Sequence, residues 1–298
     1  MSPPITVIAG PTASGKTALA IAVARRQGAE IVSADSQQVY RAFDIGTAKP
    51  SAEELAAVPH HLISCVDPTE EFSAARFQRL ADQAIEQIHA RGRRVVVVGG
   101  TGLYLRVLLH GVVEAPARDE ALRASLERLA DEAGAEALHR RLEEVDPPSA
   151  ARLPLADRVR IIRALEITLL TGRPASAWRA DHNFEADRYP CQFWVLDPPR
   201  AELYAAIDAR AHAMFERGLL EETRELVARG WREAAPMRAV GYAQALECLE
   251  GKCTEAQAIA STAQASRRYA KRQWTWFKRE RGARFVTPPY DVEALATP

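Results

Sequence analysis

The chain has 298 residues, of which 47% are hydrophobic and 26% charged, proportions that are ordinary for a soluble globular protein. At about 150 residues per domain this length predicts two domains, with enough core to fold without disulfides or metals. Lysine and arginine together number 39, as do aspartate and glutamate. The resulting net charge of zero excludes a uniformly basic nucleic-acid coat but allows a local basic face.

Hydropathy and cysteine usage both point away from membranes and secretion. No apolar run approaches the roughly 18 residues that span a bilayer, and the first residues lead into a strand-like segment without the pattern of a signal peptide. We therefore expect a cytoplasmic protein that makes no membrane contact. The four cysteines form no CxxC pair and lack metal-ligand spacing with histidine, so we expect reduced thiols and no zinc.

Strand and helix patterns alternate through the first hundred residues. Short apolar runs at Ile5–Ala9, Glu30–Asp35 and Arg94–Val98 are typical of buried parallel strands. Between them, Ala18–Arg26 and Phe72–Arg91 have the composition and periodicity of helices. This order predicts an α/β core with a parallel sheet.

The composition changes near Gly111. From about Val112 to Glu185 there is no β-branched run, and the segment looks entirely helical, with a strand pattern returning at Gln192–Leu196. We predict a core formed by residues 1–111 and 187–298, with an all-helical insertion at 112–186. The alternative is an N-terminal α/β domain followed by a helical domain, and the returning strand favours the insertion.

The last long predicted helix, about Thr254–Arg281, is strongly basic. Its two glutamates are outnumbered by seven cations, Arg267, Arg268, Lys271, Arg272, Lys278, Arg279 and Arg281. Aromatic residues lie between these cations. The helix is either a solvated charged face that packs its aromatics inward or a surface that contacts a polyanion.

Residues Gly10–Thr17 match the phosphate-loop pattern GxxxxGK[ST] between a predicted strand and a predicted helix, which is the context this motif requires. Loop N–H groups and the helix N-terminus would surround a phosphate group. Lys16 adds a mobile positive charge, and the hydroxyl of Thr17 could contact Mg²⁺. The predicted phosphate-binding residues are Gly10, Pro11, Thr12, Ala13, Ser14, Gly15, Lys16 and Thr17. The motif does not identify the ligand as ATP.

The carboxylate that would accompany this loop is unusual in its position. Nucleotide hydrolases place an Asp at the end of a second apolar strand, but Arg94–Val98 is followed by glycines and Thr101. The available acid is Asp35, at the carboxyl end of the second strand, where ligand crevices form. The alternative interpretation is that Asp35 only caps a helix or stabilises a turn. The pattern favours a transferase, either a small-molecule kinase or an enzyme that expels diphosphate, over a motor or switch.

A series of motifs continues along almost the whole chain. They are Gly10–Thr17, Ser33–Tyr40, Asp44–Pro50, Val58–Ile63, Val98–Tyr104, Arg160–Glu166, Met237–Tyr242 and Tyr269–Gln273. In this order and spacing the chain resembles the bacterial tRNA dimethylallyltransferases, which transfer a dimethylallyl group from its diphosphate to N6 of adenosine 37 in tRNAs reading codons that begin with U. The resemblance implies a P-loop NTPase-like core and a helical insertion that grips the anticodon stem-loop.

The resemblance also implies roles for particular residues. Asp35 is the expected general base, with Thr101 beside it at the tRNA, while Lys16, Arg210 and Mg²⁺ bound at Thr17 stabilise the diphosphate of dimethylallyl diphosphate. The residues expected to contact tRNA are Asp35, Ser36, Gln37, Gln38, Thr101, Arg123, Val159, Arg160, Ile161, Ile162, Arg163, Arg238, Ala239, Val240, Gly241, Tyr242 and Ala243.

The chemistry agrees with these residue types. The amino group of adenine is a weak nucleophile, so the allylic C–O bond must loosen, which demands strong stabilisation of the departing diphosphate. A carboxylate then accepts the N6 proton, which becomes acidic as the new bond forms. A base in an RNA loop can be unstacked and inserted into a pocket.

The sequence alone is also compatible with three other functions. A prenyltransferase of free adenine nucleotides would need neither the insertion nor the basic helix, and a small-molecule kinase would turn over ATP. A non-catalytic RNA-binding protein would leave the phosphate loop unexplained. We expect a monomer, because a two-domain enzyme of this kind needs no second subunit to complete its site. The adjacent His60 and His61 are expected to be structural rather than metal ligands.

Overall fold

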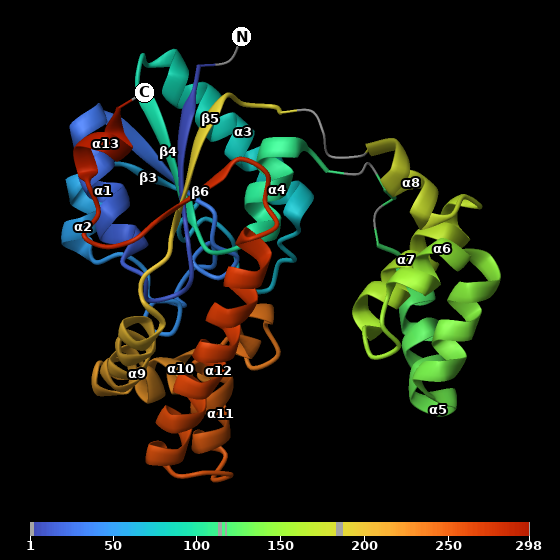
Figure 1. The fold of residues 1–298 in the computed structure, drawn as a ribbon. Coiled ribbons are helices and arrows are strands. Elements are labelled where there is room, and N and C mark those ends of the chain that lie inside the picture. Colours follow the sequence, from blue (N-terminus) through green and yellow to red (C-terminus); the bar gives the residue numbers. More distant parts are fainter. Residues whose placement is uncertain (1–2, 113–114, 117, 183–186, 298) are drawn as a thin grey trace. The chain divides into compact units, whose positions relative to one another are not determined.

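The computed structural model describes residues 3–112, 115–116, 118–182 and 187–297. The chain forms two compact units, one made of Met1–His110 and Asp187–Pro298 and the other of Gly111–Ala186 (Figure 1). The first unit contains a six-stranded sheet in which every paired strand is parallel. The second unit is helical and is inserted into the first. The predicted fold class is therefore confirmed.

The sheet has the order β3-β2-β4-β1-β5-β6, so the first strand of the chain lies inside it. Four strands lie where the apolar runs predict them: β1 has its predicted bounds, and the ends of the other three differ by at most two residues. Two short edge strands, β3 and β6, were not predicted, because neither is an apolar run. The strands are β1 Ile5–Ala9, β2 Ala29–Ser33, β3 His60–His61, β4 Arg94–Gly99, β5 Cys191–Leu196 and β6 Ala283–Val286.

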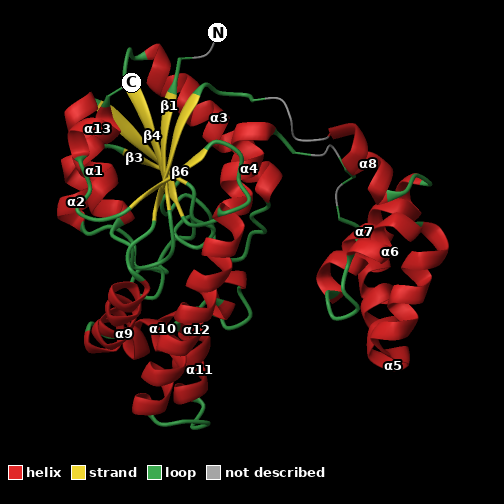
Figure 2. Ribbon diagram, viewed as in Figure 1, coloured by secondary structure: helices red, strands yellow, loops and turns green. Residues whose placement is uncertain are grey.

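Helices cover both faces of the sheet, as expected for buried parallel strands (Figure 2). On one face, Ile8 and Val96 pack with the helices that begin and end the core unit, α1 Lys16–Gln27 and α13 Val292–Ala296. The short α2 lies on the same side, and α3 and α4 pack together on the other. Their bounds are α2 Ala52–Ala57, α3 Ala74–Ala90 and α4 Gly102–His110.

A layer of helices lies beyond the carboxyl ends of the strands (Figures 1 and 2). Its longest member is α12, Glu255–Phe277, which packs against α9, α11 and α4. Thr254 begins α12 with a capping box, in which its hydroxyl accepts from Gln257 N. The helix ends four residues before the predicted end at Arg281, so the last three of its expected cations follow it. The other elements are α9 Arg200–Glu216, α10 Leu219–Ala228, η1 Ala235–Arg238 and α11 Tyr242–Leu249.

The insertion is a helical unit with its own hydrophobic core. Leu138, Leu142, Ile161 and Leu165 are fully buried within it. Buried Asp146 accepts from Ser149 N and from Ser176 N, which joins the segments. The helices are α5 Glu120–Val145, interrupted at Gly134, α6 Pro147–Arg152, α7 Arg158–Thr171 and α8 Ala175–His182. In the described part of the chain, no helix is both long and apolar enough to cross a membrane.

Candidate active site

The phosphate-loop motif forms the turn between β1 and α1, as predicted. Gly10 has φ of 149° and lies so close to β5 that a Cβ atom there would come within 3.0 Å of Leu196 O. Gly15 adopts a left-handed conformation at the N-terminus of α1. Ser14 Oγ is buried and has no hydrogen-bond partner among the described residues. The loop thus offers a helix N-terminus and a free hydroxyl to an anion.

Lys16 is the positive charge of this loop. Its Nζ donates to Pro11 O at 2.6 Å. Burial and the neighbouring Arg210 lower the pKa of Lys16 to about 7, while the charge of Asp35 partly opposes the shift. A bound anion would raise this pKa, so the side chain is placed to gain full charge when a diphosphate arrives.

Two residues from distant helices hold the loop. Arg210 of α9 donates from Nη1 to Thr12 Oγ1 at 3.3 Å, so this predicted residue lies at the loop. Gln273 of α12 accepts from Thr12 N at 2.8 Å and donates to Gly100 O at 2.9 Å. Gly100 has no room for a side chain, since a Cβ would lie 2.2 Å from Gln273 Nε2. Gln273 thereby links the phosphate loop to the turn after β4.

Asp35 follows β2 and lies beside the phosphate loop. Its Oδ1 accepts from Gln37 N at 2.8 Å and Gln38 N at 3.2 Å, which makes it the turn residue that the alternative interpretation expected. No described residue forms a hydrogen bond with Oδ2. The half-buried carboxylate therefore keeps one oxygen for a ligand while the other stabilises its own loop.

Thr101 lies close to Asp35, as predicted. Its Oγ1 accepts from Ser36 N at 3.1 Å, and its backbone N donates to Ala34 O at 3.4 Å. Gly99 permits this approach, because a Cβ there would lie 2.2 Å from Ala34 O. Tyr269 of α12 lies near Thr101 and Gln273, and burial together with the charge of Asp35 raises the pKa of Tyr269 to about 12. The phenol therefore stays protonated at neutral pH.

Two cavities meet at Asp35. The main cavity, of about 270 Å³, extends from Thr12 and Arg210 of the phosphate-loop region to Tyr269 and Arg272 of α12. The small cavity, of about 40 Å³, lies between Asp35 and the start of α1. Its polar lining is Lys16, Thr17, Ser33, Asp35, Gln38 and His60. A single carboxylate thus faces both the phosphate-binding side and the larger, open side of the site.

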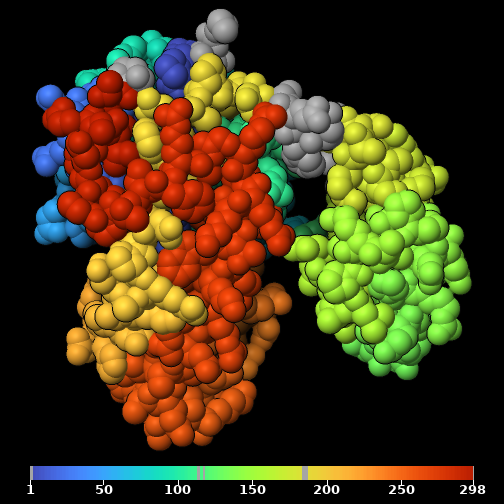
Figure 3. Space-filling view, in the orientation of Figure 1, coloured from blue at the N-terminus to red at the C-terminus, as the bar shows by residue number. Residues whose placement is uncertain are grey.

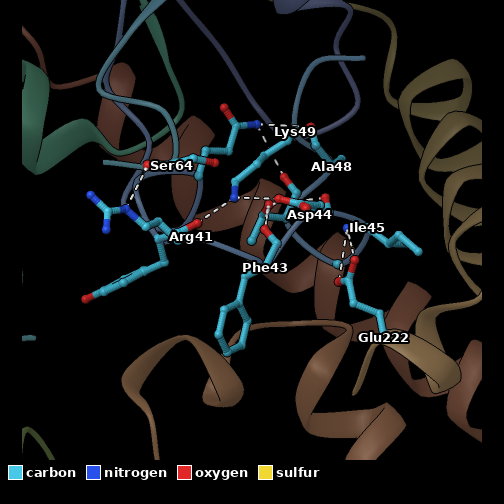
Figure 4. A network of polar contacts seen from close by, with 12 residues as sticks. Arg41, Phe43, Asp44, Ile45, Ala48, Lys49, Ser64 and Glu222 are labelled. Carbon is cyan, nitrogen blue, oxygen red and sulfur yellow. Dashed lines mark hydrogen bonds and ion pairs between the residues drawn. The ribbon is translucent and has the colours of Figure 1, made fainter. Parts of the chain in front are cut away.

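Gly46 and Thr47 line one wall of the main cavity. They belong to the loop whose residues Asp44, Ile45, Ala48 and Lys49 are labelled in Figure 4. Lys49 Nζ donates to Asp44 Oδ1 at 2.6 Å, and Gln38 Nε2 donates to Ala48 O at 3.0 Å. These contacts close the loop on itself and attach it to the segment that carries Asp35. Gln38, predicted as an RNA contact, therefore has a structural task as well.

The predicted RNA-binding residues 238–243 divide into exposed and buried groups. Arg238 is exposed and lines the main cavity with Ala239 and Val240. The side chain of Tyr242 is fully buried and supports the cavity wall, and the contact of this residue with tRNA stays a prediction.

Some of the predicted RNA-binding residues of the insertion are also exposed, and others are buried. Val159 is 67% exposed and Arg160 is exposed, so both are accessible. Ile161 and Ile162 are buried in the core of the insertion, because they lie on the inner face of α7, and their contact with tRNA stays a prediction. The accessible positions do not follow from the motif; they depend on which face of α7 packs inward.

Two predicted arginines of the insertion share a buried carboxylate. Arg163 Nη1 lies 2.6 Å from Glu166 Oε2, and Arg123 Nη1 lies 3.9 Å from the same oxygen. Glu166 also accepts from Asp119 N at 2.9 Å. This acid was missed as a functional residue, although it ends the Arg160–Glu166 motif.

The cations near α12 serve two purposes. Arg267 pairs with Asp208, and Arg281 lies 2.6 Å from Asp187, so both make structural ion pairs. Lys271 and Arg272 are exposed, and Figure 3 shows α12 at the surface of the core unit. Phe277 is buried. The helix therefore has a charged outer face and packs an aromatic residue inward, and its contact with a polyanion stays a prediction.

Both histidines of the adjacent pair His60 and His61 make hydrogen bonds within the core unit. His60 Nδ1 lies 2.7 Å from Val58 O, and His61 Nε2 lies 2.7 Å from Glu30 Oε2. Across the described ranges, no cluster of three or more His, Cys, Asp or Glu residues could hold a metal ion.

Known proteins resemble the chain over nearly its full length. Residues 38–280 match the family model described as IPP transferase. A Myxococcus xanthus protein named tRNA dimethylallyltransferase is 66% identical over 290 residues, which cover 97% of this chain and 94% of that protein. A relative from Geobacter sulfurreducens with the same name is 44% identical over 98% of this chain and 94% of its own length.

Solved structures give the same result. The crystal structure of a full-length tRNA isopentenylpyrophosphate transferase from Bacillus halodurans is 40% identical, with a TM-score of 0.73, and the match covers 99% of this chain and 93% of that one. A eukaryotic dimethylallyltransferase acting on tRNA is 29% identical with a TM-score of 0.83, covering 96% and 74% of the two chains. With a P-loop core, an inserted helical unit and these relatives, the chain belongs to the IPP transferase family of prenyltransferases.

Proposed function

We propose that this enzyme transfers the dimethylallyl group of dimethylallyl diphosphate to N6 of adenosine 37 in tRNAs that read codons beginning with U. The observation that carries the proposal is the position of Asp35, which lines both the small cavity at Lys16 and Thr17 and the main cavity. A group in that position can accept a proton from an acceptor in one cavity while the donor's diphosphate occupies the phosphate loop.

The donor side is built to stabilise a departing diphosphate. The C–O bond of the allylic diphosphate breaks, and both of its electrons leave with the diphosphate. Lys16, Arg210, the free hydroxyl of Ser14 and the N-terminus of α1 surround the place where this charge develops. Preorganised positive groups of this kind account for a large part of the rate enhancement in many enzymes.

The residues at the phosphate loop also fit a Mg²⁺ ion. Thr17, Ser33 and Asp35 present hard oxygen atoms around the small cavity, and Mg²⁺ is usually held by one or two carboxylates together with substrate phosphates and water. We infer that Thr17 holds the ion, which would neutralise diphosphate charge when bound. The remaining steps are performed by the side chains of the enzyme.

The acceptor adenine would occupy the main cavity. As the bond between N6 and the allylic carbon forms, the N6 proton passes to the free Oδ2 of Asp35. Thr101, whose Oγ1 accepts from Ser36 N, and Tyr269 lie beside this carboxylate. The protonated phenol of Tyr269 can donate to the base but cannot compete with Asp35 for the proton.

The RNA would contact cations around the main cavity and on the insertion. We place Arg238 and Arg272 at the anticodon loop, and we infer that Arg123, Arg160 and Arg163 of the insertion grip the stem. Phosphate contacts from such arginines would position the RNA without reading its sequence. The enzyme would work as a cytoplasmic monomer, since all of the groups named here come from one chain.

One incubation tests the donor, the acceptor and the reaction together. The enzyme is mixed with unmodified tRNA that carries A36-A37-A38 and with either dimethylallyl diphosphate or ATP, and the nucleosides are analysed by mass spectrometry. We expect one five-carbon prenyl unit on A37 with dimethylallyl diphosphate alone. Phosphate transfer from ATP without any prenyl gain would instead support a kinase.

A further inference from the structure

Glu222 of α10 reaches the loop that forms one wall of the main cavity. Its two carboxylate oxygens lie 3.1 and 3.0 Å from the backbone N of Ile45, which donates to them (Figure 4). Glu222 lies outside every motif that identified the family, and it does not line the cavity itself. Its connection to the site therefore runs through the loop.

Tyr242 completes this connection. Its hydroxyl donates to Glu222 and accepts from Gly46 N at 3.2 Å. The ring leaves no space beside Gly46, where a Cβ atom would lie 2.5 Å from Tyr242 Cε2. Phe43 packs edge-on against the same ring, with 5.0 Å between the ring centroids. Burial and Glu222 raise the pKa of Tyr242, so it remains a phenol that donates.

These contacts join two walls of the main cavity. Gly46 and Thr47 line one wall, and Arg238, Ala239 and Val240 line another directly before Tyr242 in the chain. Any change in the distance between Gly46 and Tyr242 changes the separation of the walls. The phosphate loop is held independently by Arg210 and Gln273, which do not contact this group.

We propose that Glu222, acting through Ile45 and Tyr242, is a positioning residue that fixes the width of the pocket for the acceptor adenine. The inference rests on the proposed function, because it needs the adenine in the main cavity. It assigns a task to an acid on α10 that touches neither substrate. Removal of Glu222 should loosen the acceptor side and leave the donor side intact.

Steady-state kinetics of purified variants test this division. Tyr242→Phe keeps the ring against Gly46 but removes the hydroxyl, and Glu222→Ala removes the carboxylate. We expect each to raise the KM for tRNA by at least about tenfold, because each loses a hydrogen bond to the charged Glu222 and at least one further bond, with the KM for dimethylallyl diphosphate unchanged. Glu222→Gln retains an oxygen for Ile45 N–H and the phenol, so it should recover most of the tRNA affinity.

The matched control is Glu221→Gln, a substitution of the exposed neighbour of Glu222 on the same helix. It removes the same charge from α10 without touching the loop, and it should behave as the wild type. Equal increases in the KM for both substrates, or no increase for tRNA in Tyr242→Phe, would overturn the proposal. Should Glu222→Ala fail to fold, the other two substitutions at these positions decide the matter.

Hydrogen exchange separates this proposal from the proposed function. The amides of Ile45 and Gly46 should exchange faster in both Glu222→Ala and Tyr242→Phe, whatever reaction the enzyme catalyses. If the wild type transfers no prenyl group, the proposed function is wrong. If the wild type prenylates A37 and these amides exchange faster while the KM for tRNA stays at the wild-type value, Glu222 holds the loop without positioning the acceptor.

Discussion

Among single residues, Lys16 links the proposed binding of the donor diphosphate to pH. Lys16 has a pKa of about 7, mainly because it is buried and secondly because Arg210 repels its charge. A bound diphosphate raises that pKa, so binding above pH 7 requires Lys16 to take up a proton. Below pH 7 the lysine is already charged, and binding gains nothing from further acidification.

This linkage predicts the pH dependence of donor affinity. The affinity for dimethylallyl diphosphate, measured by calorimetry without tRNA, should fall as the pH rises above 7, by at most about tenfold per pH unit. Phosphate esters complete their ionisation near pH 6, so the ligand itself changes little in this range. Lys16→Arg stays charged and should give a flat profile. A slope of the same size in Lys16→Arg would disprove the role of Lys16.

Several functional residues could be predicted from the sequence, and others could not. Asp35 and Thr101 could be predicted as site residues, because each follows a strand whose carboxyl end faces the ligand crevice. Glu222 was missed because its importance depends on the loop that it touches, which is 177 residues away in the chain. The motif placed Tyr242 at the tRNA, which stays a prediction, but it gave no sign that the Tyr242 side chain is buried against Gly46.

At the scale of elements, α12 is the structural link between the phosphate loop and the turn after β4. Tyr269 and Gln273 lie four residues apart and therefore share one face of the helix. The sequence predicted that α12 is basic and aromatic. The side chain that contacts Thr12 and Gly100, however, is the buried amide of Gln273. Periodicity predicted the helix, and only the packed structure shows which polar side chain is turned inward.

Removing this amide should damage both stability and donor binding. Gln273→Ala leaves Thr12 N and Gly100 O without their partner, and we expect a loss of about 1–3 kcal/mol in the free energy of unfolding. The KM for dimethylallyl diphosphate should rise as well, because the loop is less well held. Urea denaturation measures the first effect. Gln264→Ala, at an exposed position of the same helix, is the control and should change neither quantity.

The edge strands illustrate why some elements escaped prediction. Both β3 and β6 are short and partly exposed, so neither shows the apolar run that marked the inner strands. Their pairing is provided by neighbours already in place, β2 and β5. In contrast, the fully buried β1 was predicted with its observed bounds, because its composition alone distinguishes it from a loop.

At the scale of the whole molecule, a chain with zero net charge carries its exposed cations at selected positions. Arg238 and Arg272 lie at the main cavity, and Arg160 lies on the insertion. Since these arginines would contact RNA phosphates, tRNA binding should release counterions. Composition could exclude a uniform basic coat but could not locate these groups.

The affinity for tRNA should therefore fall linearly on a plot of log K against log salt concentration. Arg238→Ala should reduce the magnitude of that slope by about one for each phosphate that the variant no longer neutralises, and Arg160→Ala should do the same if the insertion grips the stem. Arg232→Ala is the control, because this exposed arginine is paired with Glu233 and Glu250. Slopes that are unchanged in all variants would contradict the proposed RNA surface.

In the proposed mechanism Asp35 removes the proton from the acceptor amine, and single-turnover prenyl transfer by Asp35→Asn measures that step. Asparagine retains an oxygen for Gln37 N and Gln38 N, so the turn should persist. We expect the rate of transfer to fall by about 10²–10⁴-fold, while the dissociation constants for tRNA and dimethylallyl diphosphate stay within about twofold of the wild type. Near-normal transfer by Asp35→Asn would contradict this mechanism.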